Sequence, residues 1–329
     1  MAPSTLGLGT YLGEPTAAAD AAYVEAALAF SAAGGTVFDT AANYRAGRSE
    51  RALGEAFRNL PREGCFISTK AGYLPMGDGV TQESPRAWFQ RMLAGPGILS
   101  PDDVVDGCHA LTPRYLAHQL EVSRAALGVD ALDLFHLHNP EQQLPHLGPD
   151  RFYGMIREAF EACEGFVRAG RIRAYGTATW NGFRVPAGRP DHLSLERLWA
   201  AAEAAGGRDH HFRWIQLPLN LALPEAFLAP TQTLGGEAMT PLRAAQALGL
   251  SVQTSASIMQ ARILAQLPAD LVAAFGAHTP AQAALQFARS CPGVTTALCG
   301  MGRKEHVLEN AEVLAFPKVE ATLLEGLFT

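Results

Sequence analysis

The sequence alternates short apolar segments, with the composition of strands, and longer segments with the composition of helices. Eight such pairs follow one another between Leu6 and Val313. Strict alternation predicts parallel strands that are joined by helical crossovers. Eight units in a chain of 329 residues favour an α/β fold of the (β/α)8 TIM barrel type. An open doubly wound sheet is the alternative, but no Gly-x-Gly-x-x-Gly motif separates a strand from a helix.

The boundaries of these elements follow from Gly, Pro, Ser and Thr at the expected turns and caps. Strands are expected at residues 6–11, 36–39, 65–70, 132–138, 172–179, 212–220, 251–255 and 294–299. Helices are expected at residues 17–33, 49–59, 112–128, 150–169, 194–205, 240–248, 279–291 and 303–313. Ser49 and Thr112 are the expected N-caps of their helices. No change in composition marks a linker, so one barrel domain is expected over residues 1–329.

One long stretch, residues 71–111, interrupts the alternation directly after the third strand. Structureless loops beyond ~12–15 residues are uncommon and are often functional. We interpret the stretch as an inserted flap over the barrel mouth, with one short helix near residues 85–93. Trp88, Phe89 and His109 are then candidates for a substrate-binding wall. The alternative is a surface decoration that lies away from the chemistry.

Composition narrows the class of partner and the kind of site. The net charge is −6 and no basic block occurs, which makes nucleic acid and anionic membranes unexpected partners. The five cysteines are scattered and never form Cys-x-x-Cys, so neither disulfides nor a zinc site is expected. The N-terminus has no signal-peptide pattern, and no apolar run approaches the ~20 residues that span a bilayer. We therefore expect a cytoplasmic protein with a small-molecule substrate.

Four side chains with acid–base chemistry stand where expected strands end. Asp39 closes the second strand, Lys70 the third and His138 the fourth. Tyr44 follows in the loop after Asp39. Each has an ordinary structural reading, such as a turn cap or a core histidine. In a barrel, however, these strand ends converge on one mouth, where active sites lie.

The four residue types complement one another chemically. A phenol has a free pKa near ~10 and is a poor acid at neutral pH. A neighbouring ammonium lowers that pKa, and a carboxylate paired with the ammonium makes its buried charge tolerable. A histidine can hydrogen-bond a substrate oxygen. The set predicts a general acid beside a carbonyl-sized hole. His136 and His138 could form a metal pair, but no third ligand is near them, so no metal is expected.

The chain resembles the aldo-keto reductases over nearly its full length. The matching segments are Leu6-Gly-Leu-Gly-Thr-Tyr11, Asp39-Thr-Ala-Ala-Asn-Tyr44, Gly47-Arg-Ser-Glu50, Leu53-Gly54, Ile67-Ser-Thr-Lys70, Leu132-Asp-Leu-Phe-His-Leu-His-Asn-Pro140, Arg171-Ile-Arg-Ala-Tyr-Gly176, Gln216 with Asn220, and Glu309-Asn310. The resemblance implies a (β/α)8 barrel and carbonyl reduction with Tyr44 as proton donor. It makes Lys70 the modulator of the Tyr44 pKa, Asp39 the partner of Lys70, and His138 the residue that orients the substrate oxygen.

The resemblance also implies NADP(H), bound in an extended form with its nicotinamide at the barrel mouth. The positions that it assigns to the cofactor are Thr10, Tyr11, Asp39, Thr179, Gln216, Ser255, Gly300, Met301, Gly302, Arg303, His306, Glu309 and Asn310. Arg303, Lys304 and a helix N-terminus are reasonable partners for an anion.

This chain departs from the family where the nicotinamide is held. Gly176-Thr-Ala-Thr179 stands where the family has Gly-Val-Ser-Asn, and Ser255-Ala-Ser-Ile258 replaces Tyr-Ser-Pro-Leu. The usual Ser or Thr of the phosphate turn is also absent. Two alternatives to the reductase follow: a non-redox lyase or isomerase that uses the same four residues, and a non-catalytic cofactor-sensing subunit. The intact acid–base set favours an enzyme. The oligomeric state is not predicted.

Overall fold

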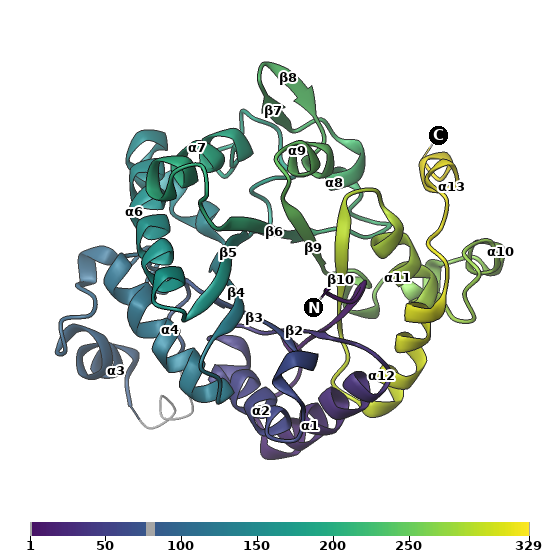
Figure 1. Ribbon diagram of the computed structural model, residues 1–329, viewed down its shortest axis with the longest axis horizontal. Coiled ribbons are helices and arrows are strands. Elements are labelled where there is room, and N and C mark those ends of the chain that lie inside the picture. The colour runs from purple at the N-terminus through teal and green to yellow at the C-terminus, as the bar shows by residue number, and fades with distance from the viewer. Residues whose placement is uncertain (1, 77–82, 329) are drawn as a thin grey trace.

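Eight parallel strands close into a barrel in the computed structural model, which describes residues 2–76 and 83–328 (Figure 1). The order around the barrel is β1-β10-β9-β6-β5-β4-β3-β2, and every neighbouring pair is parallel. The strands are β1 (Leu6–Gly9), β2 (Val37–Asp39), β3 (Phe66–Ala71), β4 (Leu132–His138), β5 (Ile172–Ala178), β6 (Phe212–Pro218), β9 (Ser251–Ser255) and β10 (Val294–Gly300). The predicted TIM barrel is therefore confirmed.

A helix follows each barrel strand, and Figure 1 shows these helices as a ring around the barrel. They are α1 (Ala17–Ala32), α2 (Arg48–Phe57), α4 (Pro113–Leu127), α6 (Pro149–Arg168), α7 (Leu195–Gly206), α9 (Pro241–Ala247), α11 (Pro280–Ser290) and α12 (Lys304–Ala311). Thr112 caps α4 as predicted, since its side chain accepts from the Tyr115 N–H. The prediction for Ser49 is wrong, because α2 begins at Arg48 and the Ser49 hydroxyl instead donates to the Thr10 carbonyl.

The alternation of side chains along β4 shows how the barrel sorts its residues. Phe135 points outward, where its ring lies 6.4 Å from that of Phe166 on α6. His136 and His138 lie on the opposite face of the strand and so point into the barrel. All seven residues of β4 are buried, as expected for a strand between a packed interior and a layer of helices. The apolar layer stabilises the fold, while the inward positions are left for polar chemistry.

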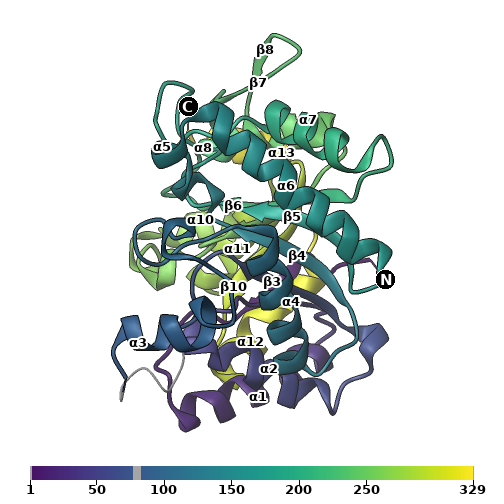
Figure 2. The ribbon, with the colours of Figure 1, turned by 90° about the vertical axis from the view of Figure 1, so that its left-hand side faces the viewer.

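Several shorter elements decorate the barrel, and of these only the short helix near residues 85–93 was predicted. A two-stranded hairpin, β7 (Gln232–Leu234) and β8 (Glu237–Met239), projects from one end of the molecule (Figure 2). The short helices are α3 (Pro85–Phe89), α5 (Leu144–Leu147), α8 (Glu225–Leu228), α10 (Ala269–Ala274) and α13 (Ala321–Gly326). The C-terminal α13 lies at the periphery, whereas the N-terminus lies near the barrel (Figure 1).

The insertion packs beside the barrel. The predicted short helix is α3, which continues into a π-helical turn (Gln90–Ala94), and Figure 1 shows α3 outside the ring of helices. Trp88 is buried in a separate apolar cluster with Leu93 and Tyr115, and Phe89 packs against the same cluster. Residues 77–82 of the expected flap lie outside the described residues. In the described part of the insertion, the apolar side chains of this cluster bury one another against Tyr115 of α4.

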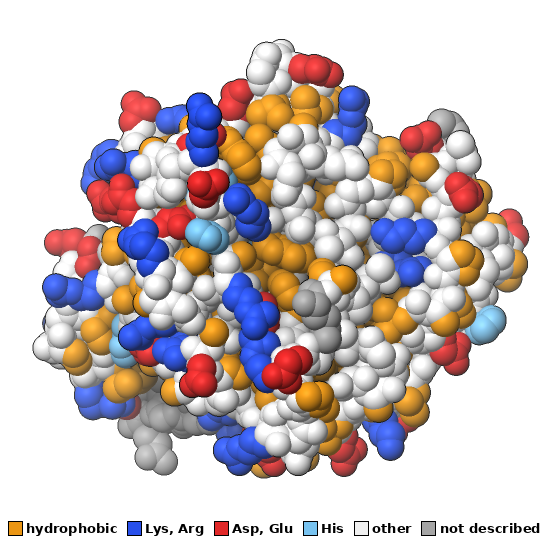
Figure 3. Space-filling model, viewed as in Figure 1, with side chains coloured by type: hydrophobic (Ala, Val, Ile, Leu, Met, Phe, Trp, Pro, Cys, Tyr) orange, Lys and Arg blue, Asp and Glu red, His pale blue; other side chains and the backbone are white. Residues whose placement is uncertain are grey.

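Charged side chains of both signs are interspersed on the face drawn in Figure 3. This arrangement agrees with the absence of a basic block in the sequence. Among the described residues, no helix combines the length and the apolar character that crossing a membrane requires.

Candidate active site

A cavity of about 500 Å³ opens at the carboxyl ends of the barrel strands. Gly9, Asp39, His138, Ala178 and Gln216 reach it from five different strands, and β9 and β10 contribute their last residues. Nine of the predicted site residues line this cavity: Thr10, Tyr11, Asp39, Tyr44, His138, Thr179, Gln216, Ser255 and Gly300. Strand ends are where (β/α)8 barrels carry their chemistry.

Lys70 and Asp39 form a buried ion pair beneath the cavity. Lys70 Nζ lies 2.5 Å from Asp39 Oδ2 and also donates to the Thr40 carbonyl at 2.8 Å. The other carboxylate oxygen accepts from Ser68 Oγ at 3.0 Å and from Gln216 Nε2 at 3.1 Å. Burial lowers the pKa of Lys70, but Asp39 and Tyr44 outweigh it, so the net pKa lies above the ordinary value. The lysine is therefore held charged and in a fixed direction.

The Tyr44 hydroxyl meets this ammonium. The two groups hydrogen-bond, and Lys70 Nζ lies 5.0 Å from the centre of the Tyr44 ring. Burial raises the pKa of Tyr44 above its ordinary value, and the Lys70 charge opposes that rise. The expectation of a lowered pKa is thus corrected, because desolvation of the phenolate outweighs the ammonium. Tyr44 is a protonated donor at neutral pH whose phenolate Lys70 is placed to stabilise.

His138 lines the cavity opposite Tyr44, with 5.8 Å between the two ring centres. Burial, together with the nearby Lys70 charge, holds the pKa of His138 well below its ordinary range, so the ring is neutral. His109, predicted as a substrate residue, is fully buried and lies outside the cavity lining. Its Nε2 lies 2.7 Å from the His138 carbonyl oxygen, to which it donates. The structure therefore makes His109 a support for the backbone of His138.

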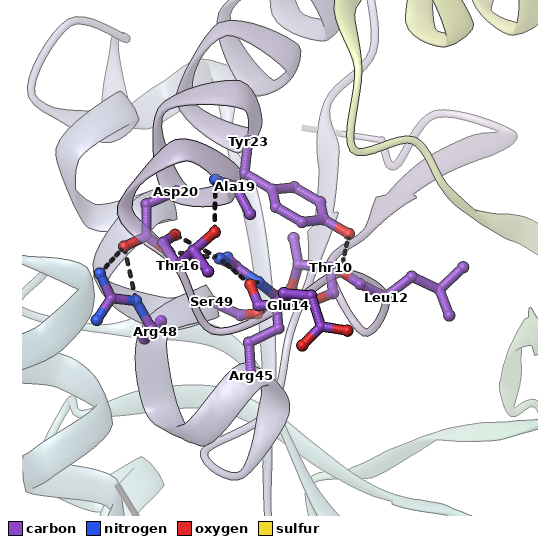
Figure 4. Close-up of polar contacts among 10 residues, drawn as sticks. All are labelled: Thr10, Leu12, Glu14, Thr16, Ala19, Asp20, Tyr23, Arg45, Arg48 and Ser49. Atoms are coloured by element: carbon purple, nitrogen blue, oxygen red, sulfur yellow. Dashed lines mark hydrogen bonds and ion pairs between the residues drawn. The ribbon is translucent and has the colours of Figure 1, made fainter. Parts of the chain in front are cut away.

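Arg45, next to Tyr44, ties the loop after β1 to the loop after β2 (Figure 4). Its guanidinium donates to the Glu14 and Thr16 carbonyls and pairs with Asp20 at 2.6 Å. It adopts a left-handed backbone, with φ of 51°, and its side chain is completely buried. Non-glycine residues in this region carry strain that the surroundings must offset. The loop held in this way brings Tyr11 to within 5.1 Å of the Tyr44 ring centre.

The opposite wall offers few polar side chains. Ala178 and Thr179 line the cavity, and the Thr179 hydroxyl donates to the Gln216 carbonyl at 3.3 Å. Ser255 also lines it and offers only a small side chain. Gln216 is the best-placed hydrogen-bonding group on this side, since it lines the cavity and is anchored to Asp39.

A strained segment follows β9 and borders the cavity. Ala256, Met259, Gln260 and Ala261 all have positive φ although none is glycine. The Ala256 carbonyl accepts from Asn220 Nδ2 at 2.9 Å, which holds the start of the segment in place. Backbone strain of this kind collects at ligand clamps and catalytic loops.

The residues assigned to the far end of a cofactor lie along β10 and α12. Gly300 lines the cavity, whereas Met301 is buried beneath it. Arg303 and His306 are exposed at the start of α12. Asn310 is buried, and the Glu309 carbonyl accepts from Gln282. The structure thus brings Gly300 to the cavity and leaves Met301, Gly302, Arg303, His306, Glu309 and Asn310 outside its lining.

Sequence reasoning missed several residues of the cavity. Tyr73 and Asn139 line it and hydrogen-bond to each other at 3.0 Å. Trp180 also lines it, with half of its surface exposed. An aromatic residue directly after a strand end was the available signal for both Tyr73 and Trp180. No comparable signal marks Asn139.

Glu141 supports the loop that carries Trp180. One carboxylate oxygen accepts from the backbone N–H groups of Trp180, Asn181 and Gly182 at 2.6, 3.1 and 3.4 Å. The other oxygen is buried and has no partner among the described residues. Burial raises the pKa of Glu141 to about 7, although the backbone N–H groups oppose the rise.

The chemistry of the site is acid–base chemistry. Across residues 2–76 and 83–328, no group of three or more His, Cys, Asp or Glu side chains is arranged to hold a metal ion. A protonated phenol, a fixed ammonium and a neutral imidazole meet at one cavity. This set can protonate, or deprotonate, an oxygen that binds between Tyr44 and His138.

Comparison with known proteins identifies the family of this barrel. The chain is 29% identical over 144 residues to a D-threo-aldose 1-dehydrogenase from a Pseudomonas species, a match over 44% of this chain and 40% of that protein. It is 27% identical over 180 residues to an NADH-specific methylglyoxal reductase from Escherichia coli K12, over 53% of this chain and 48% of the reductase. The chain thus matches less than half the length of each of these two relatives.

A solved structure shares the whole fold. The crystal structure of an aldo/keto reductase from Klebsiella pneumoniae, in complex with NADP and acetate, superimposes with a TM-score of 0.65 at 23% identity. The superposition covers 98% of this chain and 91% of that chain. The sequence profile described as the aldo/keto reductase family matches residues 5–185. Because that match spans more than half of the chain and includes all four acid–base residues of the cavity, the protein belongs to the aldo/keto reductase family.

Proposed function

We propose that the protein is an NADP(H)-dependent oxidoreductase that interconverts a carbonyl and an alcohol, with Tyr44 as the general acid or base. One observation carries the proposal: the ammonium of a buried Lys70–Asp39 pair donates to the Tyr44 hydroxyl at the wall of a cavity. A general acid that becomes an anion when it donates its proton is stabilised by a fixed positive charge beside it, and the Lys70–Asp39 pair supplies that charge.

Tyr44, His138 and Lys70 have different roles in the proposed proton transfer. A substrate oxygen between Tyr44 and His138 accepts a hydrogen bond from each, since His138 is neutral and carries one ring N–H. As negative charge develops on that oxygen, Tyr44 gives it a proton and Lys70 stabilises the phenolate that remains. In the reverse direction the phenolate takes the proton of an alcohol. The nicotinamide cofactor supplies or accepts the hydride when it is bound.

The cavity fits such a cofactor in two respects. Gln216 donates through Nε2 to Asp39 and Gln253, which leaves its Oε1 as an acceptor on the cavity wall. Gly300 borders the cavity, and a Cβ at that position would meet Leu12 at 3.4 Å, so a side chain there would fill the space. Gln216, Thr179 and Ser255 would hold the nicotinamide end. Arg303, Lys304 and His306, at the exposed start of α12, would meet the phosphates.

Binding and turnover test the proposal together. Titration with NADPH and with NADH, followed by nicotinamide fluorescence, measures affinity. A carbonyl panel measures turnover and should begin with aldoses and methylglyoxal, because two relatives are named for them. We expect micromolar affinity and turnover that Tyr44→Phe removes. No binding at millimolar cofactor refutes the proposal.

A second candidate is a lyase or isomerase that transfers only protons. The observation that favours it is the apolar Ala178 and the small Ser255 on the wall that should hold a nicotinamide. This enzyme would turn over its substrate without cofactor, and Tyr44→Phe would still remove the activity. Cofactor binding with no turnover, in both wild type and Tyr44→Phe, would instead indicate a cofactor-sensing subunit.

A further inference from the structure

Two polar side chains that the proposed proton transfer does not use lie beside His138 in the cavity. They are Tyr73, which stands two residues after β3, and Asn139, which directly follows β4. Asn139 Nδ2 donates to the Tyr73 hydroxyl at 3.0 Å. The Tyr73 ring lies nearly perpendicular to the His138 ring, with 5.0 Å between their centres, and the Tyr44 ring lies 5.8 Å from the same ring. The pair therefore adjoins the position of the substrate oxygen.

The Tyr73–Asn139 pair keeps one hydrogen-bond donor and one acceptor for a ligand. The Tyr73 oxygen accepts from Asn139, which leaves the phenol proton to donate. Asn139 uses Nδ2 for this contact, which leaves its Oδ1 as an acceptor on the cavity wall. Reversing the amide would leave an acceptor on Tyr73 and a donor on Asn139, so the count would be the same. A hydroxyl group, which both donates and accepts, matches this pair.

The surroundings of Tyr73 hold it in this position. Its carbonyl accepts from the Tyr115 hydroxyl of α4 at 2.8 Å. Its backbone bridges to that of His109, whose ring centre lies 5.0 Å from its own. Gly72 lets the chain pass close to the site, because a Cβ there would lie 2.7 Å from the His138 carbonyl oxygen. Tyr73 is thus positioned before any ligand arrives, which lowers the entropic cost of binding one.

The charges around the cavity favour a neutral group at this pair. Among the described residues that line the cavity, Asp39 is the only Asp, Glu, Lys or Arg, and its charge is paired with Lys70. A carboxylate or phosphate that binds beside Tyr73 would therefore lose water without gaining a cation of its own. A neutral hydroxyl carries no such penalty.

We propose that Tyr73 and Asn139 form a second subsite, which binds a hydroxyl group of the substrate near the carbonyl that meets Tyr44 and His138. The inference rests on the proposed function and narrows it to neutral hydroxyaldehydes and hydroxyketones as the preferred substrates. The Tyr73 hydroxyl donates to the substrate hydroxyl, which in turn donates to Asn139 Oδ1. A substrate without that hydroxyl leaves the donor and the acceptor without these partners, which weakens its binding in the transition state.

A matched pair of aldehydes tests the subsite. Glyceraldehyde and propanal share a three-carbon skeleton, but only glyceraldehyde carries hydroxyl groups. The ratio of their kcat/KM values is measured with NADPH in wild type and in Tyr73→Phe, so the intrinsic reactivities of the aldehydes cancel in the comparison. Phenylalanine keeps the ring beside His138 and removes only the hydroxyl. The ratio should fall about five- to tenfold in this variant, as expected for the loss of one neutral hydrogen bond.

Two further variants separate binding from folding. Asn139→Gly removes the amide but tolerates the left-handed backbone at this position, where φ is 46°, and should lower the ratio in the same way. Tyr153→Phe removes a tyrosine hydroxyl on α6, outside the cavity lining, where that hydroxyl accepts from the Ser194 N–H. It is the matched control and should leave the ratio unchanged.

The outcomes distinguish the subsite from the proposed function. An unchanged ratio in folded Tyr73→Phe and Asn139→Gly overturns the inference. So does a Tyr73→Phe variant that weakens NADPH binding instead, since the pair would then belong to the cofactor. Reduction of methylglyoxal, which has no hydroxyl group, reports the proposed function independently. A wild type that reduces methylglyoxal but neither three-carbon aldehyde overturns the subsite alone, whereas one that binds no NADPH and reduces no carbonyl refutes the proposed function.

Discussion

Lys70 Nζ lies 2.5 Å from Asp39 Oδ2 inside the barrel, and less than a twentieth of either side chain is exposed. The ammonium also bonds the Thr40 carbonyl and the Tyr44 hydroxyl, so its three protons all have partners. A buried pair of this kind adds little net stability, but removing one member strands the other charge. The main role of the pair is thus to hold the Lys70 ammonium in a fixed position beside Tyr44.

Removing one member of the pair should cost more stability than removing both. We expect Lys70→Met or Asp39→Asn to destabilise the fold by about 3–5 kcal/mol, because each leaves an unpaired buried charge. The double variant should be more stable than either single variant. Urea unfolding of the four proteins measures this, and turnover should be lost in all three variants. A double variant that is less stable than both singles contradicts the prediction.

The raised pKa of Tyr44 predicts different pH profiles for the two directions of reaction. Reduction uses the phenol as an acid, and the phenol persists until the pH exceeds that raised pKa. Its rate should therefore be flat from about pH 6 to pH 9. Oxidation uses the phenolate, so its rate should rise by about tenfold per pH unit over the same range. Profiles of kcat/KM in both directions measure this, and an oxidation rate that levels off near neutrality would refute the assignment.

Arg45 should act through the loop after β1, and its neighbour Ala46 provides a matched control. Both residues have left-handed backbones, with φ of 51° and 57°. Arg45→Ala removes the guanidinium and should cost about 2–3 kcal/mol of stability, the range for hydrogen bonds to a charged group. Ala46→Gly relieves similar backbone strain, keeps the Arg45 contacts with the loop after β1 and should be neutral or stabilising. Amide hydrogen exchange over residues 10–16 should accelerate only in Arg45→Ala. Equal exchange in both variants would show that Arg45 does not hold the loop after β1 in place.

The sequence allowed the barrel and half of the site to be predicted, for a physical reason. Strand–helix alternation and Thr-Pro helix starts are local signals, and each barrel strand and its following helix were predicted close to their observed bounds. Asp39, Lys70 and His138 were found because each closes a strand, and parallel strand ends converge. The net pKa of Tyr44 was not foreseen, since desolvation depends on packing by residues that are distant in sequence.

The remaining residues of the site are set by contacts that no local pattern encodes. Gln253 looks like any polar residue of a short strand, and only the closed barrel brings it against Gln216 and His136. The short hairpin β7–β8 and helix α5 carry weak patterns of a few residues each. The aromatic residues of the insertion suggest a ligand wall as readily as a small separate core, and Trp88 lies in such a core.

A variant of Trp88 tests whether this side chain packs the insertion or contributes to substrate binding. It is 8% exposed and packs with Leu93 and Tyr115 beside α4. Trp88→Ala should loosen the insertion by about 3–5 kcal/mol, the usual loss for a buried aromatic, and leave the KM for a carbonyl substrate unchanged. Met92→Ala, on the same segment but 38% exposed, is the control and should have little effect. Limited proteolysis within residues 83–111 measures the loosening, and a large change in the KM for the substrate in Trp88→Ala would support the predicted role in substrate binding.

Glu141 should make stability depend on pH near neutrality. Its folded pKa, about 7, exceeds its ordinary value of 4.5 because the carboxylate is buried. The folded protein therefore binds a proton more tightly than the unfolded chain does. The resulting stabilisation is fully present below about pH 4.5 and is lost as the pH rises through about 7, by roughly 3 kcal/mol in total.

The variant Glu141→Gln removes this titration but keeps an oxygen for the N–H groups of Trp180 and Asn181. Between about pH 5 and pH 8, wild type should lose roughly 2.5 kcal/mol relative to the variant, because the glutamine amide does not ionise. Urea unfolding of both proteins at each pH measures the difference, in which all other titrating groups cancel. The loop that carries Trp180 should lose protection from amide hydrogen exchange, relative to the intrinsic exchange rate, at high pH in wild type alone, because the ionised carboxylate is disfavoured in its buried site. Parallel stability curves for the two proteins would show that Glu141 does not titrate in this range.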